Sequence, residues 1–204
     1  MKTKKLRLGL SSLVAALLLP LFAGGATGVA QAAAAPSIAA TESTVDTTID
    51  TLAVDRQLIV NTALKEVGVK PPACGKYGPC AKYDWCAMFV EWVWKQAKVS
   101  PVPTTWVARG VGKWGVQHKL FKPRPAGGLG DPVPGDLVIY GPPDGVVGGH
   151  VSVVVAVDRA HGTIDTVDGN FGNKVAHRKH LVATKVTAGA KKVHISGYVK
   201  PPGA

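Results

Sequence analysis

Hydrophobic positions follow a helical period in the first part of the chain beyond residue 50. Residues 85–97 give the clearest case, because apolar side chains recur there every three to four positions. Such a stripe predicts a helix with one face against a core. A second helix is predicted over residues 56–68, with Asp55 as its N-cap and Gly68 as its stop. A third, over residues 106–118, is weaker because it contains three glycines.

The pattern changes after Pro125, where short runs rich in β-branched residues alternate with Gly, Pro and Asp. These runs predict five strands, PGDLVIYG, HVSVVVAVD, GTIDTVDGN, VAHRKHLV and VHISGYVKP. Helices followed by sequential strands are typical of an α+β domain. We therefore expect N-terminal helices packed on a mainly antiparallel sheet.

The first 32 residues have the features of a secretory signal peptide. Four basic residues precede an apolar stretch at 8–22, and Ala30 and Ala32 place small residues at a cleavage site. A retained membrane anchor is the alternative, but the stretch is shorter than the ~20 residues that cross a bilayer, and Pro20 interrupts it. We expect cleavage after Ala32 and a secreted or wall-associated product with no membrane span.

Two further regions follow the predicted leader. Residues 33–51 contain no aromatic residue and few that could form an apolar face, which predicts a flexible linker. Residues 52–204 are sufficient for one domain with its own core. We expect this domain to be a monomer.

The net charge narrows the expected partners. The chain has 24 Lys and Arg against 13 Asp and Glu, and removal of the leader leaves a formal charge of +7. Because export removes nucleic acid as a partner, the polyanions available to the protein are wall polymers and anionic lipid surfaces. A solvated basic face that binds nothing is equally compatible with this charge.

Three cysteines remain after export, and an odd number leaves one thiol over. Three pairings are possible. The turn-rich sequence from Cys74 to Cys80 can bring its ends into disulfide range, so we expect that pair and a free Cys86. Zinc ligation competes with this interpretation, but the Cys-x5-Cys-x5-Cys spacing differs from the short pairs of structural zinc sites.

Cys86 lies in the first turn of the helix predicted over residues 85–97. At this position the free amides and the positive end of the helix dipole favour a thiolate. The same amides could hold the oxyanion that forms when a thiolate attacks a carbonyl. The alternative is that Cys86, beside Trp85 and Phe89, is a small buried apolar residue.

His150 differs from the other five histidines, which lie in turns, at a helix end or in polar strands. It opens the most apolar predicted strand directly after two glycines, where a substrate has room to approach. In the next strand, alternation places Asp168 and Asn170 on one face. A hairpin would return that end toward His150, where a carboxylate or amide could orient the imidazole. The alternative is that residues 168–170 form a plain turn.

Four separated stretches resemble the CHAP family, the cysteine, histidine-dependent amidohydrolases and peptidases. They are DWCAMFVEWV around Cys86, PGDLV, GHVSVV around His150 and DGN, in the family's order and spacing. The resemblance covers residues 54–201 and implies a papain-like fold. It also implies cleavage of amide bonds in peptidoglycan, by an endopeptidase or an N-acetylmuramoyl-L-alanine amidase.

The resemblance also implies the roles of individual residues. Cys86 would be the nucleophile, His150 its base and Asp168 the residue that orients the imidazole, with Asn170 as a second polar member. Family members often have Glu where Asp168 stands, so Asn170 is the alternative for the orienting role. For the second oxyanion donor, the candidates are Tyr83 and Tyr77.

No metal and no cofactor is expected. Some phage members of the family bind calcium through several acids ahead of the nucleophile, whereas residues 64–85 contain only Glu66 and Asp84.

Two other functions remain open. One is a non-catalytic wall-binding protein on the same fold. The other is an NlpC-type endopeptidase, in which Ser-Gly typically follows a catalytic Asp-Cys, whereas here Trp85 intervenes and Ala-Met follows.

Overall fold

A computed structural model describes residues 53–145 and 148–204, so the predicted signal peptide and the whole of the predicted linker lie outside the described residues. Three helices come first, α1 (Arg56–Lys65), α2 (Cys86–Gln96) and α3 (Ala108–Gln117), with a 3-10 turn, η1 (Ala73–Lys76), between the first two. Asp55 caps α1 as predicted, because its carboxylate accepts a hydrogen bond from the Leu58 amide at 2.9 Å. The helix ends at Lys65, earlier than the predicted stop at Gly68.

Seven strands follow, five of which coincide with the predicted runs. They are β1 (Phe121–Pro123), β2 (Leu137–Tyr140), β3 (His150–Asp158), β4 (Thr163–Asp168), β5 (Ala176–Val182), β6 (Thr187–Ala188) and β7 (Val193–Val199). The sequence did not predict β1 and β6, since strands of three and two residues are too short to show a period.

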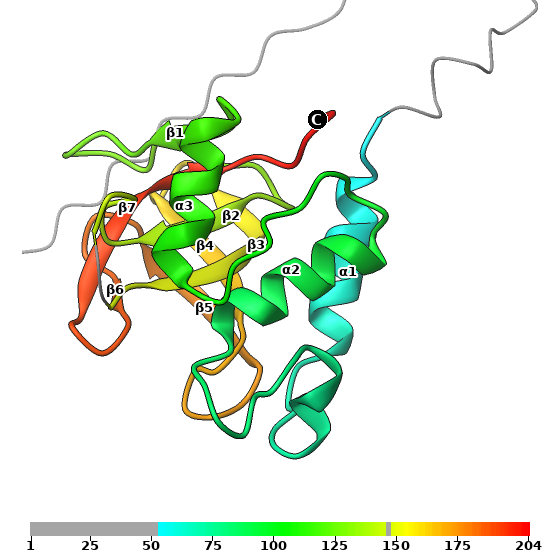
Figure 1. Ribbon diagram of the computed structural model, residues 1–204. Helices are drawn as coiled ribbons and strands as arrows, with labels where there is room; N and C mark the ends of the chain where they lie inside the picture. The colour runs from blue at the N-terminus through cyan, green and yellow to red at the C-terminus, as the bar shows by residue number, and fades with distance from the viewer. Residues whose placement is uncertain (1–52, 146–147) are drawn as a thin grey trace, which may run out of the picture. The chain divides into compact units, whose positions relative to one another are not determined.

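All strand pairs are antiparallel, which confirms the predicted α+β class. The order across the sheet is β1-β7-β2-β3-β4-β5, and β6 pairs with β7. The last strand therefore inserts between β1 and β2, while β2 to β5 form a simple meander (Figure 1). β3 and β4 are neighbours in this meander, so the end of β4 runs back toward the start of β3.

The sheet has two apolar faces. One packs against all three helices and forms the larger core, which includes Trp85, Phe89 and Trp94 together with Val151 and Val167 of the strands. The other face buries a smaller cluster that β6 and the segment before it help to cover. Because side chains alternate along a strand, His150 and Asp168 point to the face opposite Val151 and Val167.

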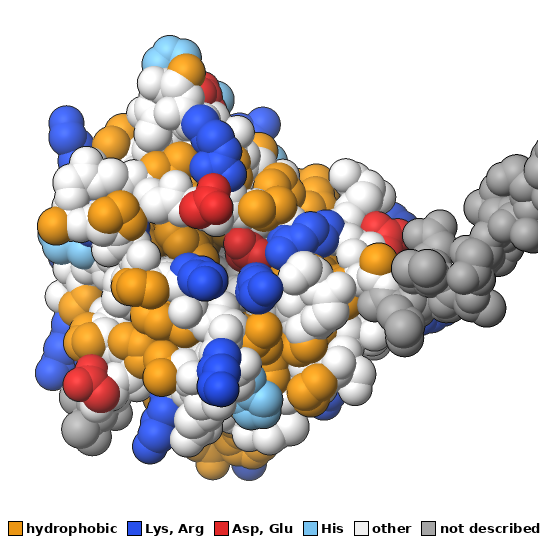
Figure 2. All heavy atoms as spheres, turned by 90° about the horizontal axis from the view of Figure 1, so that it is seen from above, with side chains coloured by type: hydrophobic (Ala, Val, Ile, Leu, Met, Phe, Trp, Pro, Cys, Tyr) orange, Lys and Arg blue, Asp and Glu red, His pale blue; other side chains and the backbone are white. Residues whose placement is uncertain are grey.

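The described surface is basic overall but shows no single concentrated patch in the view of Figure 2. Lys and Arg side chains are spread over that face among apolar side chains, with a few Asp and Glu between them. No helix in the described part of the chain has the length and apolar character needed to span a bilayer.

Candidate active site

The start of α2 holds Cys86 with its amide groups uncapped. The N-cap residue is Trp85, whose side chain makes no capping hydrogen bond, so the first-turn amides stay available to a ligand. Trp85 is itself fully buried and stacks on Tyr77 with ring centroids 5.7 Å apart. This packing fixes the point at which the helix begins and therefore the position of Cys86.

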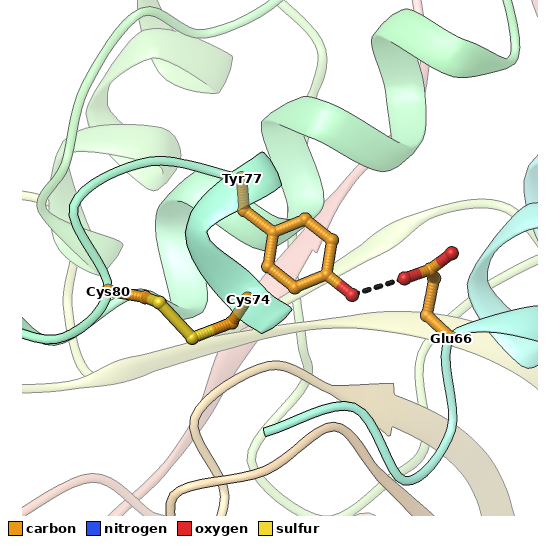
Figure 3. The surroundings of a disulfide bond; sticks show 4 residues. All are labelled: Glu66, Cys74, Tyr77 and Cys80. Carbon is orange, nitrogen blue, oxygen red and sulfur yellow. Dashed lines mark hydrogen bonds between the residues drawn. A yellow bond between two sulfur atoms is a disulfide. The ribbon is translucent and has the colours of Figure 1, made fainter. Parts of the chain in front are cut away.

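A disulfide rigidifies the segment before α2. Cys74 and Cys80 are joined (Figure 3), which confirms the predicted pair. Cys86 is the free cysteine. Cys86 is only 6% exposed, yet it lines two adjoining cavities. It is thus buried by its neighbours on one side and accessible through a cleft on the other.

His150 is the first residue of β3 and pairs with Tyr140 across the sheet. Gly149, directly before it, has φ +93, and a Cβ there would lie 2.7 Å from the Tyr140 carbonyl oxygen and 3.0 Å from Cγ of Arg109. Only glycine fits this approach. The glycine therefore sets the direction from which the chain enters β3, and with it the direction of the imidazole.

Asp168, the last residue of β4, is fully buried and contacts His150. The His150 Nε2 atom lies 2.8 Å from Oδ1 of Asp168, and the Thr166 hydroxyl donates a hydrogen bond to Oδ2. Gly169 follows, and a Cβ there would lie 2.4 Å from Cβ of Phe89, so the end of β4 packs directly on α2. This close packing brings Asp168 and Cys86 to the two sides of His150.

The charge state of His150 follows from these two neighbours. Burial by itself lowers the pKa of His150, because it disfavours the charged form. The hydrogen bond to Asp168 and the proximity of Cys86, together with the negative charges of these two groups, outweigh burial and raise the pKa of His150 from 6.5 to about 10. Because Asp168 occupies Nε2, Nδ1 is the nitrogen left to face Cys86. The imidazole therefore holds a second proton at neutral pH.

Asn170 lines the same cavity as His150 but forms no hydrogen bond with it. Its Nδ2 donates to Oδ1 of Asp84 at 2.9 Å, and its backbone has φ +59. This bond ties the turn after β4 to the segment that leads into α2. The alternative in which Asn170 orients the imidazole is thus wrong, because Asp168 occupies that position.

The two tyrosines predicted as oxyanion donors lie in different surroundings. Tyr83 is 55% exposed, contacts Trp106 with ring centroids 5.5 Å apart and lines the larger cavity at Cys86. Tyr77 is buried in the core, and its hydroxyl donates to Glu66 (Figure 3). The prediction for Tyr77 is therefore wrong, since its hydroxyl is held away from the cleft by a carboxylate.

Two adjoining cavities form the cleft at Cys86. One, of about 250 Å³, is lined by His150, Asn170 and Phe171, and the other, of about 370 Å³, by Tyr83 and Trp106. Cys86 lines both of them. An elongated substrate could thus cross the nucleophile with one part in each cavity.

Another cavity, of about 690 Å³ and larger than the two at Cys86, touches neither Cys86 nor His150. Val107 lines both the cleft and this cavity. Its lining is mostly apolar and contains no candidate nucleophile. The chemistry of the side chains, and not the volume, therefore identifies the cleft at Cys86 as the site.

Sequence reasoning did not assign three residues that the structure places at the site, Thr166, Trp106 and Arg178. Thr166 shares the strand face of Asp168, which alternation could have indicated. Arg178 lies in a strand rich in Lys and His that resembled a solvated surface.

Among the described residues there is no cluster of three His, Cys, Asp or Glu side chains that could hold a metal ion. The absence of a metal cofactor stays a prediction.

A cysteine at a helix start, facing a strand histidine that is held by a buried carboxylate, is the arrangement of cysteine hydrolases. Residues 78–170 match the model of the CHAP domain, the family that the sequence resembles. The fold is papain-like, as in that family, whose members are generally cysteine- and histidine-dependent amidohydrolases or peptidases. No curated protein and no solved structure matches the chain significantly. The matched region contains Cys86, His150, Asp168 and Asn170, whose catalytic roles stay predictions.

Proposed function

We propose that this protein is an exported peptidoglycan hydrolase that cleaves amide bonds through Cys86. The observation that carries the proposal is the placement of His150 between Cys86 and the buried carboxylate of Asp168, 2.8 Å from the imidazole. A CHAP domain favours peptidoglycan as the substrate. Export rests on the predicted signal peptide. The net positive charge adds an electrostatic attraction to anionic wall polymers.

In this mechanism the resting site holds an imidazolium at His150 beside a thiolate at Cys86. The thiolate attacks a substrate carbonyl carbon, and the oxyanion is stabilised by the uncapped amide of Cys86 and by a second donor, for which Tyr83 is the candidate that lines the cleft. His150 then protonates the leaving amine as the C–N bond breaks. This leaves the acyl group bound to Cys86 as a thioester. The neutral imidazole of His150 then takes a proton from water, the resulting hydroxide attacks the thioester carbonyl, and the C–S bond breaks to release the acid and restore the thiolate.

The direct test is digestion of purified sacculi by the wild type and by Cys86→Ala, with mass spectrometry of the released fragments. The wild type should release fragments, and Cys86→Ala should release none while still melting at a similar temperature. New amino groups within the peptide would identify an endopeptidase, and freed lactyl carboxylates on the glycan would identify an amidase.

The same experiment distinguishes the hydrolase from a non-catalytic wall-binding protein. A wall-binding protein would sediment with sacculi as the wild type and as Cys86→Ala, and neither would release fragments. Release by both variants would contradict the role of Cys86. Release of fragments by the wild type alone would support the hydrolase, and any binding to sacculi would then be recognition of the substrate.

A further inference from the structure

The buried carboxylate of Asp168 contacts two basic side chains. His150 Nε2 lies 2.8 Å from Oδ1, and Nη1 of Arg178 lies 3.4 Å from the same oxygen. Asp168 has no exposed side-chain surface, and the side chain of Arg178 is 13% exposed. A buried charge is stable only when it is paired, so the ionised form of Asp168 depends on the number of positive charges around it.

One imidazolium cannot neutralise both a thiolate and a buried carboxylate. If His150 were the only cation, the site would carry a net charge of −1 in its thiolate form. Uptake of a proton by Cys86 or Asp168 would relieve that charge, and the thiolate would become less populated. With Arg178 present, Cys86 and Asp168 are balanced by His150 and Arg178, and the site is neutral.

The fold holds Arg178 firmly in this place. It lies on β5 opposite Thr166, the residue that donates to the other oxygen of Asp168. Its guanidinium carbon lies 4.3 Å from the ring centroid of Phe171, a stacking that is typical of arginine. Phe171 in turn makes an edge contact with His150, with ring centroids 6.1 Å apart. The guanidinium therefore lies behind Phe171 and Asp168, outside the lining of the cleft and beyond the residues that match the CHAP domain.

The buried side chains of β2, β3 and β4 that lie around Asp168 are uncharged. From β2, Tyr140 lies near both Asp168 and Arg178, and burial first, then the charge of Asp168, raises its pKa well above the usual value, so its hydroxyl stays neutral. Ser152 and Thr166 are uncharged. Asp84, at the mouth of the cleft, is exposed to solvent and accepts a hydrogen bond from Asn170.

We propose that Arg178 is a positioning residue that supplies the counter-charge for Asp168, so that the charge of His150 is left to stabilise the thiolate of Cys86. This inference rests on the roles proposed above for Cys86 and His150. Arg178 does not touch the substrate. It acts through Asp168, and its effect is on the pH range in which the nucleophile is active.

The test is the rate at which iodoacetamide alkylates Cys86 as a function of pH, in the wild type, Arg178→Met and Arg178→Gln. Loss of the guanidinium should raise the pH of half-maximal alkylation by about one unit, the size expected for one charge close to a buried site. Arg178→Lys keeps the charge and should restore most of the wild-type profile. The acid limb of the hydrolysis profile should move in the same direction.

Lys179→Met is the matched control, because it removes the same charge from the neighbouring, exposed residue of β5. It should leave the alkylation profile unchanged. Equal profiles for Arg178→Met, Arg178→Gln and the control would overturn the proposal, and so would a failure of Arg178→Lys to restore the profile. Thermal melts of each variant verify that the compared proteins are folded.

Alkylation needs no wall substrate, so the two proposals can fail separately. If sacculi are not cleaved but the alkylation profile shifts as expected, the assigned substrate fails and the role of Arg178 stands. If sacculi are cleaved and the profile does not shift, the role of Arg178 fails and the hydrolase stands.

Discussion

The His150 imidazole donates from Nε2 to Oδ1 of Asp168 over 2.8 Å, and both side chains are buried. The bond fixes which ring nitrogen faces Cys86, and it determines how strongly the imidazole holds its proton.

Asp168→Asn should lower the pKa of His150 from its value of about 10, because the amide keeps the geometry but removes the negative charge. Hydrolysis should fall by roughly 10²-fold or more, as expected when the group that orients a catalytic histidine is neutralised. Titration of the imidazole nitrogens by NMR measures the pKa directly. An unchanged His150 titration in Asp168→Asn would contradict the assigned role.

The raised pKa of His150 also makes the stability of the fold depend on pH. The unfolded chain releases this proton near pH 6.5 and the folded chain near pH 10, so the contribution is fully present below pH 6.5 and is lost as pH rises to 10. Urea unfolding at several pH values should show the free-energy difference between the wild type and His150→Gln shrinking across this window. A difference that grows with pH would show that the folded-state pKa is lowered instead.

Asn170→Gly should reduce hydrolysis by about fivefold, the loss expected for one hydrogen bond of about 1 kcal/mol that positions the segment before the nucleophile. Glycine tolerates the backbone φ of +59, so the substitution isolates the bond to Asp84. The pKa of His150 should not change, in contrast to Asp168→Asn. A lowered His150 pKa in Asn170→Gly would restore Asn170 as an orienting residue.

Replacing Cys74 and Cys80 together by Ser should lower the free energy of unfolding by about 2 kcal/mol, the size expected for a short disulfide loop. The wild type should show one reactive thiol per chain when it is unfolded without reductant, and Cys86→Ala should show none. Three thiols in the unfolded wild type would contradict the disulfide.

The two tyrosines should respond differently to loss of their hydroxyls. Tyr83→Phe should lower kcat by about 10²-fold or more with little change in KM if the hydroxyl binds the oxyanion. Tyr77→Phe should leave kcat unchanged and destabilise the protein by about 1–3 kcal/mol, because Glu66 loses a buried donor. If only KM rises in Tyr83→Phe, Tyr83 is part of the substrate wall and not a donor.

Local patterns in the sequence were sufficient for the main elements of the site. The apolar stripe of α2 placed Cys86 at a helix start, and the paired strands β3 and β4 brought Asp168 back toward His150 as the alternation indicated. The disulfide is predicted from the odd number of cysteines and from the short, turn-rich segment between Cys74 and Cys80, and the structure contains it. Each of these depends on residues close in sequence, whose periodicity and turn chemistry are directly readable.

Contacts between distant segments were decided only by the tertiary structure. The insertion of β7 between β1 and β2 has no local signal. The sequence does not show which of Tyr77 and Tyr83 lines the cleft, because the hydrogen bond from the Tyr77 hydroxyl to Glu66 forms only in the packed structure. Arg178 reaches Asp168 because the β4–β5 register shifts between Ile164 and Thr166, beside a positive φ of 52 at His180. A one-residue shift reverses which strand face each side chain occupies, so only the folded register could place a charged residue of β5 against the buried carboxylate.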